Sequence, residues 1–197
     1  MTTLLPGFSH PVFQAQSAFR AVLAALSRPG TVQALGEAVE APAPLSPGAA
    51  AIALTLCDHD TPVWLDEALR AHPSVGEWLR FHCGCPLTEQ PREAAFALVA
   101  GAQDVPPFDA FNLGTAEYPD RSTTIVFSVQ TFDEGPSLSL MGPGIGGRAA
   151  FRADPLPADI AERLTRNRLL FPRGVDLLLV TATAVAGLPR SVRVVES

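Results

Sequence analysis

Apolar side chains recur at helical spacing in two separate parts of the chain, and the placement of charges predicts a third helix. A first helix is predicted over residues 11–27, where the shared face is Val12, Phe19, Val22, Leu23 and Leu26. A second helix ends at Gly84, and its apolar face carries Val75, Trp78, Leu79 and His82. A third is predicted over 158–169, because acidic Asp159 stands in its first turn and Arg166 and Arg168 in its last, which suits the helix dipole.

Between these helices the chain has short apolar and β-branched runs that predict strands. They cover residues 31–35, 61–65, 95–100, 123–129, 137–141, 149–153, 175–181 and 191–195. Run 175–181 is apolar apart from its acidic second residue and final threonine, which predicts a central strand covered on both faces. Segment 48–56 is apolar all round and predicts a buried helix, with a buried strand as the alternative.

Strands and helices intermingle along the chain, and no linker is long enough to divide it. The expected fold class is therefore α/β, with a mixed β-sheet flanked by helices in a single domain over residues 1–197. The chain is 47% hydrophobic and 17% charged, which provides enough apolar material for a substantial core.

Charge and composition exclude several classes of function. A net charge of -6 argues against a general nucleic-acid backbone binder. The longest charge-free apolar run, 41–57, contains prolines at 42, 44 and 47, so no membrane partner is expected. Three cysteines, an odd number, favour free thiols in a reducing cytoplasm.

All 14 basic residues are arginine, and the chain has no lysine. Schiff-base chemistry needs a lysine, so pyridoxal phosphate (PLP) catalysis of the usual kind is excluded and no cofactor is expected. Genomic base composition explains such a bias without function. The functional reading is that arginine binds phosphate or phosphonate with two hydrogen bonds, and the two readings are compatible.

The glycine-rich segment 142–148 nearly matches two phosphate-binding motifs. Gly142, Gly144 and Gly147 have the spacing of a dinucleotide fingerprint, but a strand rather than a helix is predicted to follow. A P-loop would need lysine and then serine or threonine where Arg148 and Ala149 stand. We expect a turn between two strands that is structural or contacts another subunit, with anion binding through Gly144 and Arg148 as the alternative.

Two other groups could carry chemistry. His82, Cys83 and Cys85, with Cys57 upstream, offer soft ligands, but C-x-C beside a histidine is not a regular zinc spacing, so no metal site is expected. Asp58 and Thr61 lie in a polar turn that could present a general base or simply cap a chain reversal.

A further carboxylate, Asp176, sits at the mouth of the predicted central strand and needs a partner. Either Arg173 or Arg190 could serve, and the latter is expected at the start of the last strand. Such a pair is structural more often than catalytic. The sequence contains no recognisable nucleophile–base pair.

Several of these segments, in order, resemble one protein family. The most specific is Leu-Thr-Leu-Cys-Asp-His-Asp-Thr-Pro-Val-Trp-Leu at 54–65, and the others are 19–30, 79–82, 142–145, 171–177 and 189–190. Together they resemble the PhnH family, whose members are subunits of the bacterial carbon–phosphorus lyase system.

The resemblance implies an accessory subunit needed for alkylphosphonate breakdown. The system transfers alkylphosphonate to the ribose C1 of ATP and releases adenine. The implied partners are the G, I, J and L components and a second copy of the chain. The implied fold is that of the large domain of PLP-dependent transferases without the cofactor.

The residues that match the family's motifs and could touch a phosphonate or nucleotide ligand are Asp58, Thr61, Arg80, His82, Asp176 and Arg190. Cys83 and Cys85 depart from the expected pattern, which weakens the metal hypothesis further. A hypothesis of another class is a self-sufficient nucleotide- or phosphonate-binding enzyme built on the 142–148 loop.

Overall fold

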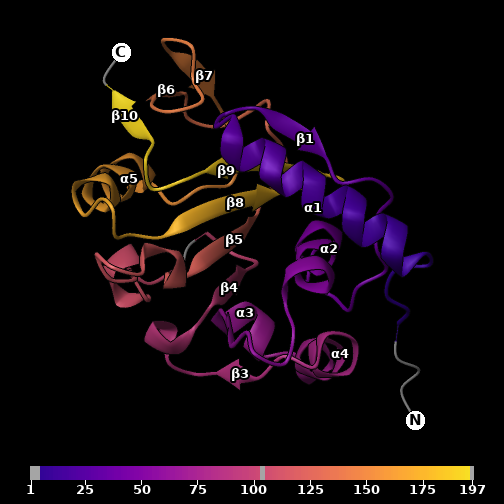
Figure 1. The fold of residues 1–197 in the computed structure, drawn as a ribbon. Helices are drawn as coiled ribbons and strands as arrows, with labels where there is room; N and C mark the ends of the chain where they lie inside the picture. The colour runs from indigo at the N-terminus through magenta and orange to yellow at the C-terminus, as the bar shows by residue number, and fades with distance from the viewer. Residues whose placement is uncertain (1–4, 103–104, 196–197) are drawn as a thin grey trace.

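A seven-stranded mixed sheet forms the centre of the protein (Figure 1). The computed structural model describes residues 5–102 and 105–195. In spatial order the strands are β1 (Val32–Ala34), β9 (Ala184–Leu188), β8 (Asp176–Val180), β5 (Thr124–Ser128), β4 (Phe96–Val99), β2 (Val63–Leu65) and β3 (Leu87–Thr88). Strand β9 is antiparallel to both of its neighbours, and the other pairs in this sheet are parallel.

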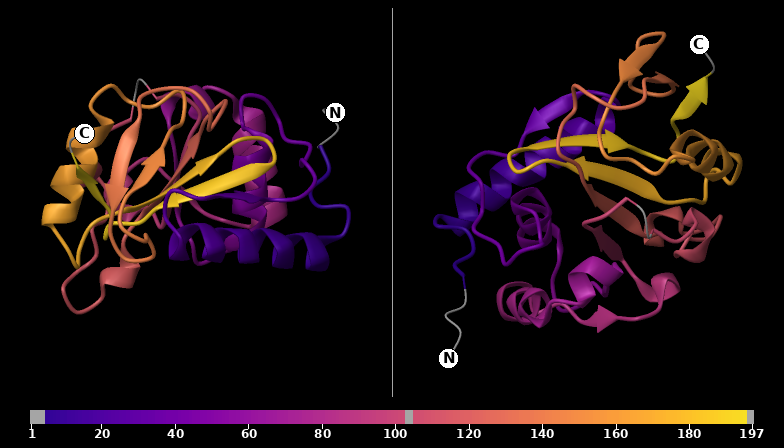
Figure 2. Two further views of the ribbon diagram at one scale, coloured as in Figure 1. Left: turned by 90° about the horizontal axis from the view of Figure 1, so that it is seen from above. Right: turned by 180° about the vertical axis from the view of Figure 1, so that it is seen from behind.

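Helices cover one face of this sheet, and a helix with a second, small sheet covers the other (Figures 1 and 2). The first face carries α1 (Pro11–Ser27), α2 (Pro47–Leu56), α3 (Glu67–Arg70) and α4 (Pro73–Cys83). The second carries α5 (Ile160–Leu169) and the antiparallel strands β10 (Arg193–Val195), β6 (Leu138–Met141) and β7 (Ala149–Phe151). Short 3-10 helices η1 (Pro91–Glu93), η2 (Phe108–Ala110) and η3 (Pro119–Arg121) occupy connections.

Strand β8 confirms the prediction of a central strand covered on both faces. Leu178 and Val180 are fully buried against the helices of the first face, while Leu177 and Leu179 are fully buried on the second. Side chains alternate between the faces of a sheet, so a strand with cover on both sides reads as a continuous apolar run.

Segment 48–56 is a helix, as the first of the two sequence interpretations predicted. Ser46 caps it by accepting a hydrogen bond from the Ala49 amide at 3.2 Å, and Pro47 occupies its first turn. The helix is apolar all round because it packs against α1, α4 and strand β5.

Three sequence predictions need correction. The expected single sheet is accompanied by a second sheet, and the strand predicted at 191–195 belongs to that one as β10. Helix α5 begins at Ile160, two residues later than predicted. Strand β9 was not predicted, because its sequence, Ala-Val-Ala-Gly-Leu, has weak strand propensity.

The surroundings of Gly187 explain why β9 consists mainly of small residues. A Cβ atom at this position would stand 2.8 Å from the carbonyl carbon of Ala25 in α1. Helix α1 therefore crosses β9 at a distance that only glycine permits. Small residues that look unfavourable for a strand are required by the packing of the helix.

Candidate functional site

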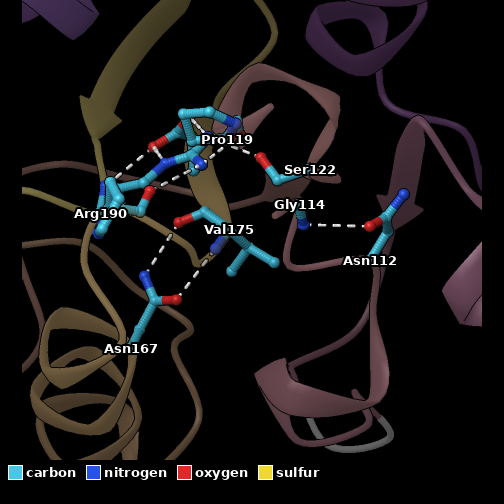
Figure 3. Close-up of polar contacts among 9 residues, drawn as sticks. Asn112, Gly114, Pro119, Ser122, Asn167, Val175 and Arg190 are labelled. Atoms are coloured by element: carbon cyan, nitrogen blue, oxygen red, sulfur yellow. Dashed lines mark hydrogen bonds and ion pairs between the residues drawn. The ribbon is translucent and has the colours of Figure 1, made fainter. Parts of the chain in front are cut away.

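The densest polar network around a charged pair joins Arg190 to Asp176 (Figure 3). Asp176 is the first residue of β8, and Arg190 follows the end of the antiparallel neighbour β9, so both lie at the same edge of the sheet. The guanidinium Nε donates to Asp176 Oδ1 at 3.1 Å and Nη2 to Oδ2 at 2.5 Å. The backbone amide of Arg190 also donates to Oδ1. Of the two arginines considered from the sequence, Arg190 is therefore the partner.

The remaining donors of the guanidinium are also engaged. Its Nη2 donates to Ser122 Oγ, and its Nη1 donates to the carbonyl oxygens of Pro119 and Pro172. An arginine side chain has five N–H donors, and each has an acceptor here. Only 12% of the Arg190 side chain is exposed. A phosphonate could bind Arg190 only by displacing one of these internal acceptors.

Asn167 forms a second connection beside this pair. Its amide nitrogen donates to the carbonyl oxygen of Val175, and its Oδ1 accepts from the Val175 amide, both at 2.9 Å. The side chain is buried and thus ties α5 to the start of β8. Gly174 has a φ of 127°, and a Cβ there would stand 2.6 Å from Asn167 Oδ1. Glycine is required at 174 for both reasons.

A third connection holds the loop before β5. The buried hydroxyl of Thr123 donates to the carbonyl of Ala94 and accepts from the amide of Asn112. The Asn112 side chain in turn accepts from the Gly114 amide at 3.0 Å. Together with the contacts of Arg190 to Pro119 and Ser122, these bonds fix the 112–122 loop against the sheet.

The network lies at the edge where the parallel strands begin. In open α/β sheets, ligands generally bind at the opposite edge, outside the carboxyl ends of the strands. Among the described residues, the donors of Arg190 and both carboxylate oxygens of Asp176 have partners within the chain, so the pair holds its loops in place and leaves none of these groups free for a ligand. The arrangement can present nearby exposed groups such as Tyr118 and Phe171 in fixed positions.

The turn that contains Asp58 and Thr61 lies at the same edge but away from the network. The Thr61 hydroxyl donates to the Asp58 carbonyl at 2.8 Å and accepts from the Asp58 amide. In the register of the sheet, Val63 at the start of β2 is three strands away from Asp176. At about 4.8 Å per strand this is a separation of about 14 Å.

Arg80 and His82 lie on α4, on the face of the molecule formed by the first helices. His82 is half-buried, as the helical pattern predicted, and its Nε2 is 3.0 Å from the carbonyl oxygen of Leu5. Arg80 is exposed and lines a shallow cavity with Arg70 and Glu77.

Gly144 and Arg148 lie in the hairpin between β6 and β7, and the expected turn between two strands is confirmed. Gly144 has a φ of 82°, and a Cβ there would clash with the carbonyl oxygen of Ser27. The glycine therefore lets the hairpin approach the end of α1. No helix follows the loop, and Arg148 is exposed.

The eight residues considered from the sequence thus occupy four separate places. In the described part of the chain, no hydrogen bond or ion pair links one of these places to another. Asn167, Ser122 and Thr123 were missed by sequence reasoning. The sequence offered one indication of these three residues: polar residues are scarce beside buried strands. That indication does not show which groups the three side chains contact.

The three cysteines lie close to the end of α4, with Cys57 and Cys85 buried. The Cys83 thiol donates to Cys85, which raises the pKa of Cys83 and lowers that of Cys85; burial raises the pKa of Cys57. Among residues 5–102 and 105–195, no group of three or more Cys, His, Asp or Glu side chains could hold a metal ion. In the same residues, no helix is long and apolar enough to cross a membrane.

Comparison with known proteins identifies the family. A family model described as "Bacterial phosphonate metabolism protein (PhnH)" matches residues 6–195. The chain belongs to the PhnH family. Within it, the PhnH subunit of alpha-D-ribose 1-methylphosphonate 5-triphosphate synthase from Rhizobium meliloti (strain 1021) is 45% identical over 186 residues. The match covers 94% of this chain and 92% of the Rhizobium protein.

A second relative matches a smaller part of the sequence. The putative C-P lyase subunit protein HtxG of Stutzerimonas stutzeri is 37% identical over 82 residues, which is 42% of each chain. Both names describe subunits, and both concern phosphonate chemistry or carbon–phosphorus bond cleavage.

Proposed function

We propose that this chain is a non-catalytic, accessory subunit of the enzyme assembly that makes alpha-D-ribose 1-methylphosphonate 5-triphosphate. The observation that carries the proposal is the match to the Rhizobium subunit of that synthase over nearly the whole of both chains. The assembly transfers alkylphosphonate to the ribose C1 of ATP, releases adenine, and so belongs to the breakdown of alkylphosphonates.

The geometry supports an accessory role in that assembly. All five guanidinium N–H groups of Arg190 donate to acceptors within the chain, Asp176 among them. The pair therefore holds two loops in place. Groups that act on a substrate need donors or acceptors left free for it. Exposed aromatic residues beside this network, Tyr118 and Phe171, suit contact with another subunit.

The finer parts of the proposal concern partners and setting. The partners are the G, I, J and L components of the carbon–phosphorus lyase system, and the chain forms a homodimer in the cytoplasm. A phosphonate or nucleotide ligand would contact residues from the set Asp58, Thr61, Arg80, His82, Gly144, Arg148, Asp176 and Arg190. The transferase activity belongs to the assembly rather than to this chain.

Two structural expectations accompany this function. Residues 1–197 form one domain, which is supported by the extent of the family match. The fold resembles the large domain of PLP-dependent transferases; a mixed seven-stranded sheet with one antiparallel strand supports this expectation. An experimental structure superposed on such a domain tests the resemblance directly.

The function is tested by expressing the chain with and without its partner subunits. ATP and methylphosphonate are supplied, adenine release is followed by chromatography, and the phosphonate product by phosphorus NMR. We expect no turnover from the isolated chain, turnover from the full assembly, and loss of turnover when this chain is omitted. The chain should also co-purify with the tagged partners.

Two results would contradict the proposal. Turnover by the isolated chain would make it an enzyme in its own right. Full activity of an assembly that lacks the chain would remove it from the reaction. A double variant, Asp58→Asn with Arg80→Met, tests the ligand set within the assembly, with Arg152→Met as a surface control.

A further inference from the structure

A cavity of about 440 Å³ lies between the last turn of α5 and strand β10. Its lining residues are Thr165, Arg168, Leu169, Phe171, Arg193 and Val194. The cavity therefore has two arginines and no acidic side chain among these residues. None of its residues belongs to the candidate ligand-binding set derived from the sequence, and the Arg190 network uses none of these side chains.

Arg168 stacks on Phe171 at this cavity, and its Nε has no hydrogen-bonding partner in the part of the chain that the structure describes. Its guanidinium carbon stands 4.7 Å from the centroid of the Phe171 ring, which fixes the group by stacking. Its Nε is fully buried and has no acceptor among the described residues. Leaving a buried donor unpaired is unfavourable, and such an atom calls for an explanation. An anionic ligand in the cavity would not reach the buried Nε, but it would compensate the charge of this partly buried guanidinium and accept from its terminal nitrogens.

Arg193 brings a second positive charge from a different element. It is exposed, belongs to β10 and pairs in register with Met141 of β6. The carboxyl end of α5 favours one cation through its dipole, which accounts for Arg168 alone. It does not account for a second guanidinium at the same cavity. The two guanidiniums together give the lining of the cavity a positive charge, which attracts anions.

The other polar side chains near the cavity already have partners within α5, so Arg168 and Arg193 are the donors available to a ligand. Glu162, the acidic residue in the preceding turns of α5, pairs with Arg166. The Thr165 hydroxyl donates to the carbonyl oxygen of Ala161 at 2.8 Å. Leu169 and Val194 add apolar walls. The cavity thus combines two guanidiniums with a small apolar surface.

We propose that this cavity binds a small molecule carrying a phosphate or phosphonate group. Arg168 and Arg193 donate to the tetrahedral oxyanion, as guanidiniums do in phosphate sites, and the organic part lies against Leu169 and Val194. The proposal does not depend on the function proposed above, because an anion site can exist on an enzyme subunit or on an independent protein.

The test is calorimetric titration of the purified full chain with inorganic phosphate, methylphosphonate and ATP, separately, at low ionic strength. We expect at least one probe to bind. Arg168→Met and Arg193→Met should each weaken its binding by about 10-fold or more, as expected for loss of charge-assisted hydrogen bonds. Methionine preserves much of the apolar stem. Arg92→Met, an exposed arginine in η1, is the matched control and should leave the affinity unchanged.

The order of affinities among the three probes identifies the source of the group: free phosphate, a small phosphonate or a nucleotide. The proposal is overturned if none of the probes binds, or if binding persists unchanged in both variants. Circular dichroism verifies that each variant is folded. If Arg168→Met is unfolded, the exposed Arg193→Met decides the outcome.

Discussion

The side chain of Asn167 completes the backbone hydrogen bonds of Val175, as a neighbouring strand would. Its amide donates to the carbonyl oxygen and its Oδ1 accepts from the amide, both at 2.9 Å. Asn167 is 2% exposed and Val175 is fully buried, so water cannot replace either bond. Position 175 stands just before the central strand, and the asparagine therefore fixes where that strand begins.

Replacing Asn167 by leucine should destabilise the protein strongly. The change leaves both the N–H and the C=O of Val175 buried without partners, and each such group costs about 1–3 kcal/mol. We expect a loss of about 2–5 kcal/mol in the free energy of unfolding, measured by urea titration. Glu162→Gln on the same helix is the exposed control. A loss below that of the control variant would show that this contact does not hold the strand.

Gly174→Ala should be far more destabilising than Gly147→Ala. Both glycines have positive φ, 127° and 86°, which disfavours a side chain. At 174 a Cβ would also stand 2.6 Å from Asn167 Oδ1, whereas nothing lies within 4 Å at 147. We expect a loss of about 1 kcal/mol at 147 and about 3 kcal/mol or more at 174 in urea titrations. Equal losses would mean that Asn167 can move away from the new Cβ atom without loss of stability.

The Arg190→Met variant should unfold at a lower urea concentration than the wild type, because the substitution leaves the Asp176 carboxylate without its ion-pair partner. The side chains of this pair are only 12% and 22% exposed, so a loss of about 3 kcal/mol is expected. Arg166→Met is the matched control, since its ion pair with Glu162 is exposed and should contribute about 0.5 kcal/mol or less. Adding Asp176→Asn to Arg190→Met should recover part of the loss. Equal effects of Arg190→Met and Arg166→Met would refute the structural role.

Gly187→Ala should loosen the packing of α1 on the central sheet. The new Cβ would stand 2.8 Å from backbone atoms of Ala25, which cannot move without shifting the helix. Overpacking of this kind costs about 1–3 kcal/mol, and hydrogen exchange should increase in α1 and β9. A Cβ at Gly146 would have no other atom within 4 Å. Gly146→Ala should therefore change neither the free energy of unfolding nor the hydrogen exchange of α1 and β9 appreciably. Unchanged exchange in α1 after Gly187→Ala would contradict this close approach.

Stability should fall as the pH rises above about 8.5, the ordinary pKa of a thiol. Burial raises the pKa of Cys57 in the folded protein, so folding favours the protonated form. Its contribution is complete below the unfolded pKa and is lost as the pH rises toward the folded one. The chain has no lysine and one tyrosine, so the thiols of Cys83, whose pKa is raised, and Cys85, whose pKa is lowered, are the main other groups to titrate there. Urea titrations at pH 7.5 and 10 should show a smaller decrease for Cys57→Ala than for the wild type. Equal decreases would argue against Cys57 as the source.

The sequence by itself determined most elements of the fold. Helical periodicity located α1 and α4, the placement of charged residues located α5 within two residues, and the apolar run identified β8 as central. It also excluded the 142–148 loop as a P-loop, because the required residue types were absent. These properties follow from spacing and residue type within short segments, which is why a pattern can reveal them.

Only the tertiary structure decided what the polar residues contact. Arg190 reaches Ser122 across 68 positions of sequence, and no local pattern indicates that bond or the choice of Arg190 over Arg173. Strand β9 was not predicted, because its residues are small. They are small because α1 packs closely across the strand. The cavity lined by Arg168 and Arg193 also exists only because α5 packs on β10. Such relationships depend on packing between distant segments, and burial there overrides local propensity.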